Sequence, residues 1–337
     1  MLRPETWGGG DMRRRAFIVG VGATALVPIT VRAQQDRVRR IVVLSGIAED
    51  DPEMIARRTV FEPALGALGW TKGSNLTIDY RSTLTDPAVV EKAVADAIAL
   101  APDLVLSSSN VVIGPLMRAT RTIPIVVVGV IDPVGQGIVQ SMARPGGNVT
   151  GFTQFEYSLA GKWLEVLKEA APRVSRVAVM RDPTRGPGIG QFAVIQAMAS
   201  THGIEPVPIN ILDLAETERA LSAFASTPNG GMIATVGGTA IRRDIIIAAA
   251  AKNRLPAIYP YRYYAADGGL ISYGPDTIEM YRAAAGYIDR VLKGEKPADM
   301  PIQAPTRYQL IVNLKTAKAL GLSVPPTILA RADEVIE

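Results

Sequence analysis

The sequence of 337 residues contains no cysteine and only one histidine, His202. The absence of cysteine excludes disulfides, thiol nucleophiles and cysteine-ligated metals. His202 precedes Gly203 at the end of a helical pattern, where an imidazole faces solvent near the negative pole of the helix dipole. Neither a nucleophile–histidine pair nor a zinc site can be assembled from this set. We therefore predict that the protein is not an enzyme and holds no metal or cofactor.

Two weaker signals for chemistry have simpler explanations. The glycine-rich run at 186–190 lacks both the GxGxxG spacing and the lysine of a phosphate-binding loop, and we interpret it as a flexible loop. The carboxylates of Asp50, Asp51 and Asp182 could in principle face each other across a cleft, as in a hydrolase. However, Asp50-Asp51-Pro52 is more simply the start of a helix.

An uninterrupted membrane-spanning run is also missing near the N-terminus. The apolar stretch at 16–31 contains Pro28 and is shorter than the roughly 20 residues that cross a bilayer. Three arginines at 13–15 precede it and Val31-Arg32-Ala33 ends it, which predicts a signal peptide over residues 1–33, cleaved after Ala33. The arginines also resemble the twin-arginine export pattern. We therefore predict a periplasmic protein; a membrane anchor is the alternative.

The excess of basic residues lies mainly in this leader. The whole chain has 36 lysines and arginines and 32 acidic residues, and residues 1–33 carry five arginines and two acids. The remaining 31 basic and 30 acidic residues give a net charge of about +1. The isoelectric point of the whole sequence, about 9.3, is therefore no argument for nucleic-acid binding. We do not expect the protein to bind nucleic acid.

From residue 39 onward, strand and helix patterns alternate. Short apolar runs rich in valine and isoleucine predict buried strands, and longer amphipathic segments between them predict helices. Expected strands are 40–46, 75–81, 103–109, 123–127, 176–182, 204–210, 231–237, 255–261, 269–274 and 306–313. Expected helices are 52–68, 86–100, 110–122, 157–171, 190–202, 214–226, 239–254 and 277–292. The order predicts an α/β protein with two doubly wound parallel-sheet lobes.

Ligands of open α/β sheets bind beyond the carboxyl ends of the strands, so we expect the site residues there. Asp132 follows the strand that starts at Ile123 and precedes Pro133, a residue typical of a helix start. It could meet a ligand ammonium group, or it could merely cap that helix. Ser45, Gly46 and the run Ser107-Ser108-Ser109-Asn110 also follow strands. A helix N-terminus with serines can bind a carboxylate, although serines are also ordinary caps.

The second half of the chain offers candidates at the corresponding positions. These are Arg181, Asp182, Gly237 and Tyr259 at strand ends, with Tyr273 near a lobe crossing. Tyrosines could supply stacking surfaces for a flat or amphipathic ligand. The neighbouring Tyr261, Tyr263 and Tyr264 could equally pack under a loop, and we favour Tyr259 alone among this cluster.

Several motifs resemble one known family. IPIV…DPVGQGIVQSMARPGGNVTGFT at 123–153, GKWLEVLKEAAP at 161–172, GGLISYGPD at 268–276 and the C-terminal segment 292–337 carry the resemblance. They are similar to the substrate-binding proteins of ABC importers, of the uncharacterised-transporter and tryptophan-binding type in the periplasmic-binding protein type I superfamily. The resemblance spans nearly all of the chain beyond the leader.

The resemblance implies two lobes joined by a hinge with several crossings, near 153–156, 272–276 and 301–306. The expected N-terminal lobe is 34–153 plus 274–300, and the C-terminal lobe is 154–273 plus 301–337. It also implies an extracytoplasmic, monomeric receptor without membrane insertion that closes on an amino acid or aromatic carboxylate. Its partners would be an ABC permease and the ATPase subunit. A sensor receptor that presents its ligand, or a hydrolase on the same fold, is the alternative.

Overall fold

The computed structural model describes residues 37–83, 87–154, 156–237 and 242–337. The predicted signal peptide lies outside the described residues. Within them, no helix is both long enough and apolar enough to cross a membrane.

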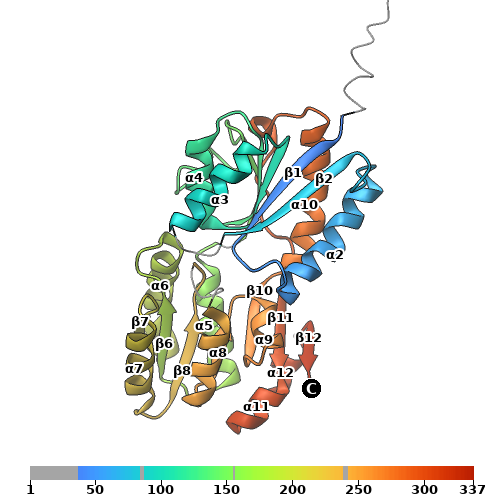
Figure 1. Ribbon diagram of the computed structural model, residues 1–337. Coiled ribbons are helices and arrows are strands. Elements are labelled where there is room, and N and C mark those ends of the chain that lie inside the picture. Colours follow the sequence, from blue (N-terminus) through green and yellow to red (C-terminus); the bar gives the residue numbers. More distant parts are fainter. Residues whose placement is uncertain (1–36, 84–86, 155, 238–241) are drawn as a thin grey trace, which may run out of the picture. The chain divides into compact units, whose positions relative to one another are not determined.

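The first sheet has five parallel strands in the order β2-β1-β3-β4-β5 (Figure 1). Its strands are β1 (Arg39–Ser45), β2 (Leu76–Ser82), β3 (Leu104–Ser107), β4 (Ile125–Val130) and β5 (Val149–Thr153). The carboxyl ends of all five strands therefore point to one edge of the sheet, where a ligand can be bound.

Helices cover both faces of this sheet because successive side chains of each strand point to opposite faces. Ile41 and Val43 of β1 pack with α2 (Pro52–Ala67) and α10 (Thr277–Leu292). Val42 and Leu44 pack on the other side with α3 (Pro87–Ala99) and α4 (Asn110–Ala119). Figure 1 shows these two helix pairs on opposite sides of β1. We call this sheet with its four helices the first lobe.

The second sheet has seven strands in the order β12-β11-β10-β9-β8-β6-β7. Its strands are β6 (Arg176–Arg181), β7 (Glu205–Asn210), β8 (Gly230–Ala234), β9 (Ala257–Tyr259), β10 (Ile271–Pro275), β11 (Tyr308–Asn313) and β12 (Glu334–Ile336). The helical elements are α5 (Leu159–Ala170), α6 (Gly186–Ala199), η1 (Ser200–His202), α7 (Leu214–Ala225), α8 (Arg243–Lys252), α9 (Arg262–Ala266), α11 (Leu314–Leu320) and α12 (Pro326–Leu329). This sheet with its helices is the second lobe, and the predicted fold class is confirmed.

Two strands of the second sheet, β11 and β12, run opposite to the other five, because β12 pairs parallel with β11. β11 pairs antiparallel with β10, with Pro275 opposite Tyr308 and Ile271 opposite Val312. After β10 the chain enters the first lobe to form α10 and the short η3 (Pro297–Asp299), and it then returns. β11 therefore begins at the edge where β10 ends, which makes the pair antiparallel. The sequence pattern predicted this strand but not its direction.

The chain passes between the lobes three times: after β5, after β10 and before β11. The first and third passages pair with each other. Phe152 forms a bridge with Gln303, and the Thr153 N–H donates to the Gln303 carbonyl at 2.8 Å. Three adjacent connections of this kind can serve as a hinge.

Two local expectations were wrong. The run at 186–190 is the first turn of α6 rather than a loop, since Pro187 is preset for a helix start. Gly188 also permits close packing there, because a Cβ at this position would lie 2.7 Å from the Asp182 carbonyl. Conversely, the segment after Asp132 forms turns instead of a helix, and Asp132 itself has a φ of 46°.

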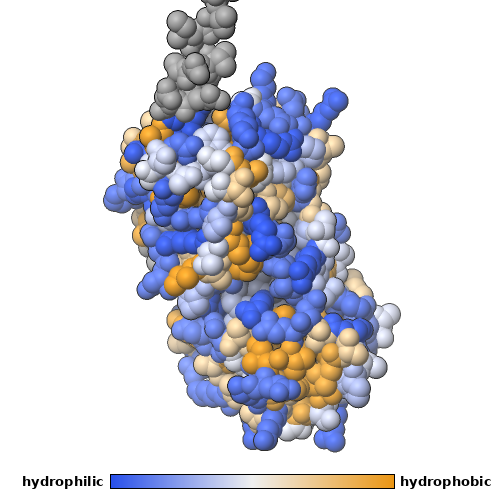
Figure 2. All heavy atoms as spheres, turned by 90° about the vertical axis from the view of Figure 1, so that its right-hand side faces the viewer, coloured by the Kyte–Doolittle hydropathy of each residue, from blue (hydrophilic) through white to orange (hydrophobic). Residues whose placement is uncertain are grey.

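The side of the molecule that carries α2, α10 and the C-terminal elements is mainly hydrophilic in its upper part, with a hydrophobic cluster lower down (Figure 2). β12 is the last strand of the second sheet, so it has a neighbouring strand on one side only. Val335 of this strand is 37% exposed.

Candidate ligand-binding site

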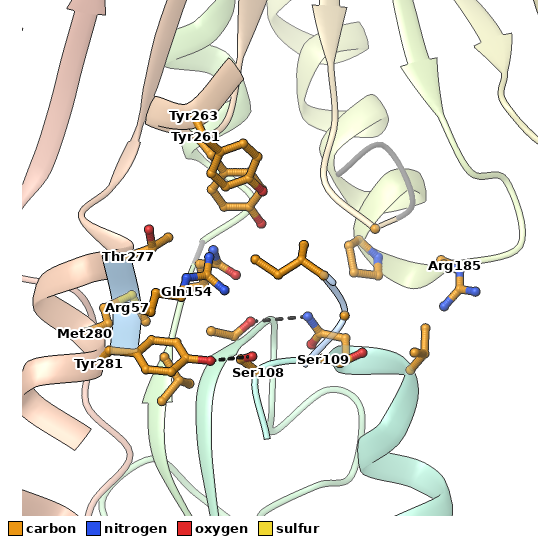
Figure 3. A pocket seen from close by; sticks show the side chains of 18 of the residues that line it. Arg57, Ser108, Ser109, Gln154, Arg185, Tyr261, Tyr263, Thr277, Met280 and Tyr281 are labelled. Atoms are coloured by element: carbon orange, nitrogen blue, oxygen red, sulfur yellow. Dashed lines mark hydrogen bonds between the residues drawn. The ribbon is translucent and has the colours of Figure 1, made fainter. Parts of the chain in front are cut away.

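A cavity of about 250 Å³ is lined by residues of both lobes (Figure 3). Tyr261 and Tyr263 lie at one end in this view, Ser108 and Tyr281 lie at the other, and Arg57 lies between them. The ends of β1 and β4 contribute Gly46, Ile47, Val128 and Gly129. The cavity is thus at the carboxyl edge of the first sheet, as expected for an open α/β fold.

The N-terminus of α4 supplies one polar wall of the cavity. Asn110 is held in place, because its Nδ2 donates to the Gly129 carbonyl at 3.2 Å and its Oδ1 accepts from the Ile131 N–H at 3.2 Å. Ser109 is the N-cap residue, but its side chain makes no capping hydrogen bond. The first N–H groups of the helix and the Ser109 hydroxyl therefore remain for a ligand.

Helices α2 and α10 form the wall around Arg57. The Arg57 Nε donates to Glu53 Oε1 at 2.9 Å, and the same oxygen accepts from Thr277 Oγ1 at 2.5 Å. The Arg57 guanidinium lies 5.2 Å from the centre of the Tyr281 ring, and the Tyr281 hydroxyl donates to Ser108 Oγ at 2.7 Å. Burial disfavours the charged guanidinium, but Glu53, together with Tyr281 and Tyr263, more than offsets this effect, so the pKa of Arg57 lies above its ordinary value.

The second lobe supplies the N-terminus of α6, through Arg185, Gly186 and Pro187. Arg185 is positioned by its Nε, which donates to Asp182 Oδ2 at 2.8 Å. The other Asp182 oxygen accepts from the N–H and hydroxyl of Thr184 at 2.9 and 2.6 Å. Burial alone would raise the pKa of Asp182, but these bonds from Thr184 and Arg185 hold it below its ordinary value.

Tyr261 and Tyr263 bring aromatic surface to the cavity. Their rings stack with centres 5.1 Å apart, and Tyr263 stacks in turn on Tyr264 at 5.2 Å. Burial raises the pKa of Tyr261 and of Tyr263 above the ordinary value, so both phenols stay neutral at physiological pH. The Arg243 guanidinium lies 5.1 Å from the centre of the Tyr263 ring.

Five of the residues predicted from sequence line this cavity: Gly46, Ser108, Ser109, Asn110 and Gly237. Ser45 and Ser107 are buried next to it, and both make local hydrogen bonds. Ser45 Oγ accepts from the Ile47 N–H at 3.2 Å, and Ser107 Oγ donates to the Ser109 carbonyl at 3.3 Å. The ligand-binding role of each of the five stays a prediction.

Asp132 does not line the cavity. Its Oδ1 accepts from the Gly135 N–H at 2.9 Å, and its Oδ2 accepts from the Tyr157 hydroxyl at 3.4 Å. Burial and the Asp132 carboxylate raise the pKa of that phenol. The carboxylate therefore caps a turn, which is close to the alternative considered from sequence.

The remaining candidates from the second lobe also lie outside the lining. The Arg181 guanidinium stacks over Phe192 at 4.5 Å, and Asp182 positions Arg185. Tyr259 is 1% exposed and stacks on Tyr264 within the core. Tyr273 stacks on Tyr308 with ring centres 6.1 Å apart. Tyr261 and Tyr263, which the sequence assigned to packing, are the tyrosines of this cluster that reach the cavity.

Sequence reasoning missed Arg57, Gln154, Thr277, Met280 and Tyr281. Four of them lie on helices α2 and α10, whereas the predicted site residues lie at or near strand ends. One signal could have revealed Arg57: it follows Glu53 by four residues on a face that also carries Phe61 and Leu65. An arginine on the apolar face of a helix is rarely buried without a partner.

Comparison with known proteins agrees with this architecture. The family model of the ABC transporter substrate binding proteins matches residues 41–336, so the chain belongs to this family. The tyrosine-binding protein of Clostridioides difficile is 25% identical over 273 residues, which cover 81% of this chain and 79% of that protein.

Solved structures show the same fold. A conserved domain protein from Vibrio cholerae is 27% identical with a TM-score of 0.81, over 89% of this chain and all of that chain. A Streptococcus pneumoniae protein solved in complex with L-Trp is 23% identical with a TM-score of 0.80, over 88% of this chain and 99% of the other. The protein is therefore a solute-binding protein of the ABC transporter class, and the resemblance noted in the sequence is confirmed.

Proposed function

We propose that this protein is an exported receptor that closes on a small amphipathic carboxylate and delivers it to an ABC permease. The observation that carries the proposal is the composition of the cavity. The first lobe contributes a buried guanidinium, hydroxyl groups and a helix N-terminus, and the second contributes two stacked phenol rings. A ligand that satisfies both walls must touch both lobes. It then favours the closed arrangement over the open one and shifts the hinge equilibrium.

The ligands named for relatives support an amino acid or aromatic acid as the ligand class. The curated relative carries the name tyrosine-binding protein, and one structural neighbour was solved with L-Trp. A carboxylate held by a guanidinium and helix N–H groups, with a ring on Tyr261 or Tyr263, would account for such ligands. We also propose that the N-terminal lobe comprises residues 34–153 plus 274–300. The C-terminal lobe would then comprise 154–273 plus 301–337.

Small-angle scattering tests the closure. The radius of gyration of the purified mature chain should fall when a ligand identified by native mass spectrometry is added to saturation. An unchanged scattering profile would contradict the proposal. Export is tested separately, because protein isolated from the periplasm should begin at Gln34, whereas a full-length form retained in the membrane would argue for an anchor.

A further inference from the structure

Among the described residues, two charged side chains line the cavity, Arg57 and Arg185. Both are arginines, and no described lining residue is acidic. An amino acid brings an ammonium group, which has three N–H donors and a positive charge. Burying that charge without an anionic partner is strongly unfavourable. The cavity therefore provides for the carboxylate of such a ligand but not for its ammonium group.

Two acidic side chains, Glu53 and Asp182, accept hydrogen bonds from residues that line the cavity. Glu53 accepts from Arg57 and Thr277, and Asp182 accepts from Thr184 and Arg185. Withdrawing Glu53 to meet a ligand would leave Arg57 buried without its anion. Asp132, the residue that the sequence suggested for an ammonium group, caps its own turn.

Donors for an anion, by contrast, remain unused. Arg57 is 8% exposed and uses its Nε for Glu53, while its two terminal nitrogens make no hydrogen bond to any described residue. The terminal nitrogens of Arg185 are likewise without a hydrogen bond in the described part of the chain. The Ser109 hydroxyl is buried at the α4 N-terminus without a partner among the described residues. A planar carboxylate matches the fork of a guanidinium.

The rest of the lining limits the body of the ligand. Tyr261, Tyr263, Met280 and Pro187 offer aromatic and apolar surface. The volume of about 250 Å³ lies just below the range of about 300–1,000 Å³ for ordinary ligand pockets. These dimensions suit a small ligand with one ring or two fused rings.

We infer that the ligand is a small arylalkanoic acid, a carboxylate without an α-ammonium group, rather than an amino acid. This inference rests on the proposed function and narrows its ligand class. Arg57 and Ser109 bind the carboxylate, and the phenol rings of the second lobe hold the aromatic body.

Calorimetric titration with matched ligands tests the inference directly. 3-(4-Hydroxyphenyl)propanoate is compared with L-tyrosine, indole-3-propanoate is compared with L-tryptophan, and tyramine supplies the ammonium group alone. Each acid should bind at least tenfold more tightly than its amino acid, and tyramine should give no heat. Equal or tighter binding of either amino acid overturns the inference.

A sugar arm separates failure of this inference from failure of the proposed function. Compaction by an amino acid, with no response to the acids, overturns the inference and leaves the proposed function in place. Compaction by D-arabinose alone overturns the inference and also the carboxylate ligand of the proposed function. No heat and no compaction with acids, amino acids or sugar counts against both.

A variant that adds a carboxylate to the cavity gives an independent test. Gln154 lines the cavity, so Gln154→Glu introduces a carboxylate of nearly the same shape. It should weaken binding of the arylalkanoic acid and reduce its preference over the amino acid by tenfold or more. Gln196→Glu, at an exposed position of α6 outside the cavity lining, adds the same charge and should leave the preference unchanged. An unchanged preference in folded Gln154→Glu contradicts the inference.

Discussion

The first lobe faces the cavity with a guanidinium, hydroxyl groups and a helix N-terminus, whereas the second faces it, apart from Arg185, with phenol rings, proline and glycine. Both lobes are built from the same alternation of strands and helices, and both place strand ends toward the cavity. The difference arises from the helix that each strand leads into. After β3 the chain continues directly into α4, whereas after β9 it continues into α9 and its tyrosines. A repeated fold can thus divide recognition between a polar wall and an aromatic wall.

Among the predicted substitutions, the largest loss of stability is expected at Arg57, in the polar wall of the first lobe. Arg57→Ala leaves Glu53 buried without its cation, and removal of one partner of a buried pair costs about 3–5 kcal/mol. We expect a loss of unfolding free energy in this range by urea denaturation. The double variant Arg57→Met with Glu53→Gln removes both charges and should recover much of the stability without recovering ligand affinity. Stability of the single variant equal to wild type would show that the pair is not buried in solution.

The second largest effect is expected from an ion pair that joins the two lobes outside the cavity. Arg243 of α8 pairs with Asp51 Oδ2 at 3.0 Å, and both side chains are largely shielded from solvent. Asp51→Asn keeps the helix cap, because asparagine caps as well as aspartate, but it removes the charge. We expect a total loss of roughly 1.5–3 kcal/mol, the usual range for a hydrogen bond to a charged group. Part of this loss should lower the free energy of unfolding, and part should weaken the closed arrangement of the lobes.

Scattering and calorimetry measure the part of the loss that concerns closure of the lobes. If the pair holds the lobes together, Asp51→Asn without ligand should have a larger radius of gyration and weaker ligand binding than the parent chain. Lys92→Gln removes one member of an exposed ion pair within α3 and should leave both quantities unchanged. Identical behaviour of Asp51→Asn and Lys92→Gln would mean that the pair does not contribute to closure.

A smaller effect is expected where the polar wall is tied to α10. Tyr281→Phe removes the hydroxyl that donates to Ser108, and Ser108→Ala removes the acceptor. Each should reduce stability by about 1 kcal/mol, and the double variant should cost little more than one single change. Additive effects of the two changes in urea denaturation would show that this hydrogen bond is not formed.

The architecture was predictable because its signals are local. Valine-rich runs such as those of β1 and β4 predict buried parallel strands, and the α10 helix was expected at the bounds it adopts. The antiparallel direction of β11 was not predictable from its own residues. It depends on the point at which the chain returns from the first lobe, which is a property of the whole fold.

The site was predictable only in part, for a related reason. Strand ends can be located in sequence, and Gly46 and Ser108 were found in this way. Arg57 and Tyr281 lie on helices far apart in the chain, and they meet only because both helices cover the same face of the first sheet. Which of several tyrosines reaches the cavity likewise depends on the stacking within the second lobe, as Tyr259 and Tyr261 show.

Asp132→Asn is expected to have the smallest effect, and it tests whether Asp132 belongs to the polar wall. The carboxylate accepts from Gly135 and Tyr157, and the amide oxygen of asparagine can accept the Gly135 hydrogen bond equally well. We expect a loss of at most about 1 kcal/mol in stability and an affinity within about twofold of the parent chain. If Asp132 instead met a ligand ammonium group, the same change would remove a charge-assisted bond of roughly 1.5–3 kcal/mol and lower the affinity by about ten- to more than a hundredfold. A calorimetric titration separates the two outcomes. A tenfold loss in a folded variant would place Asp132 in the polar wall and would contradict the arrangement in which that wall consists of donors for a carboxylate.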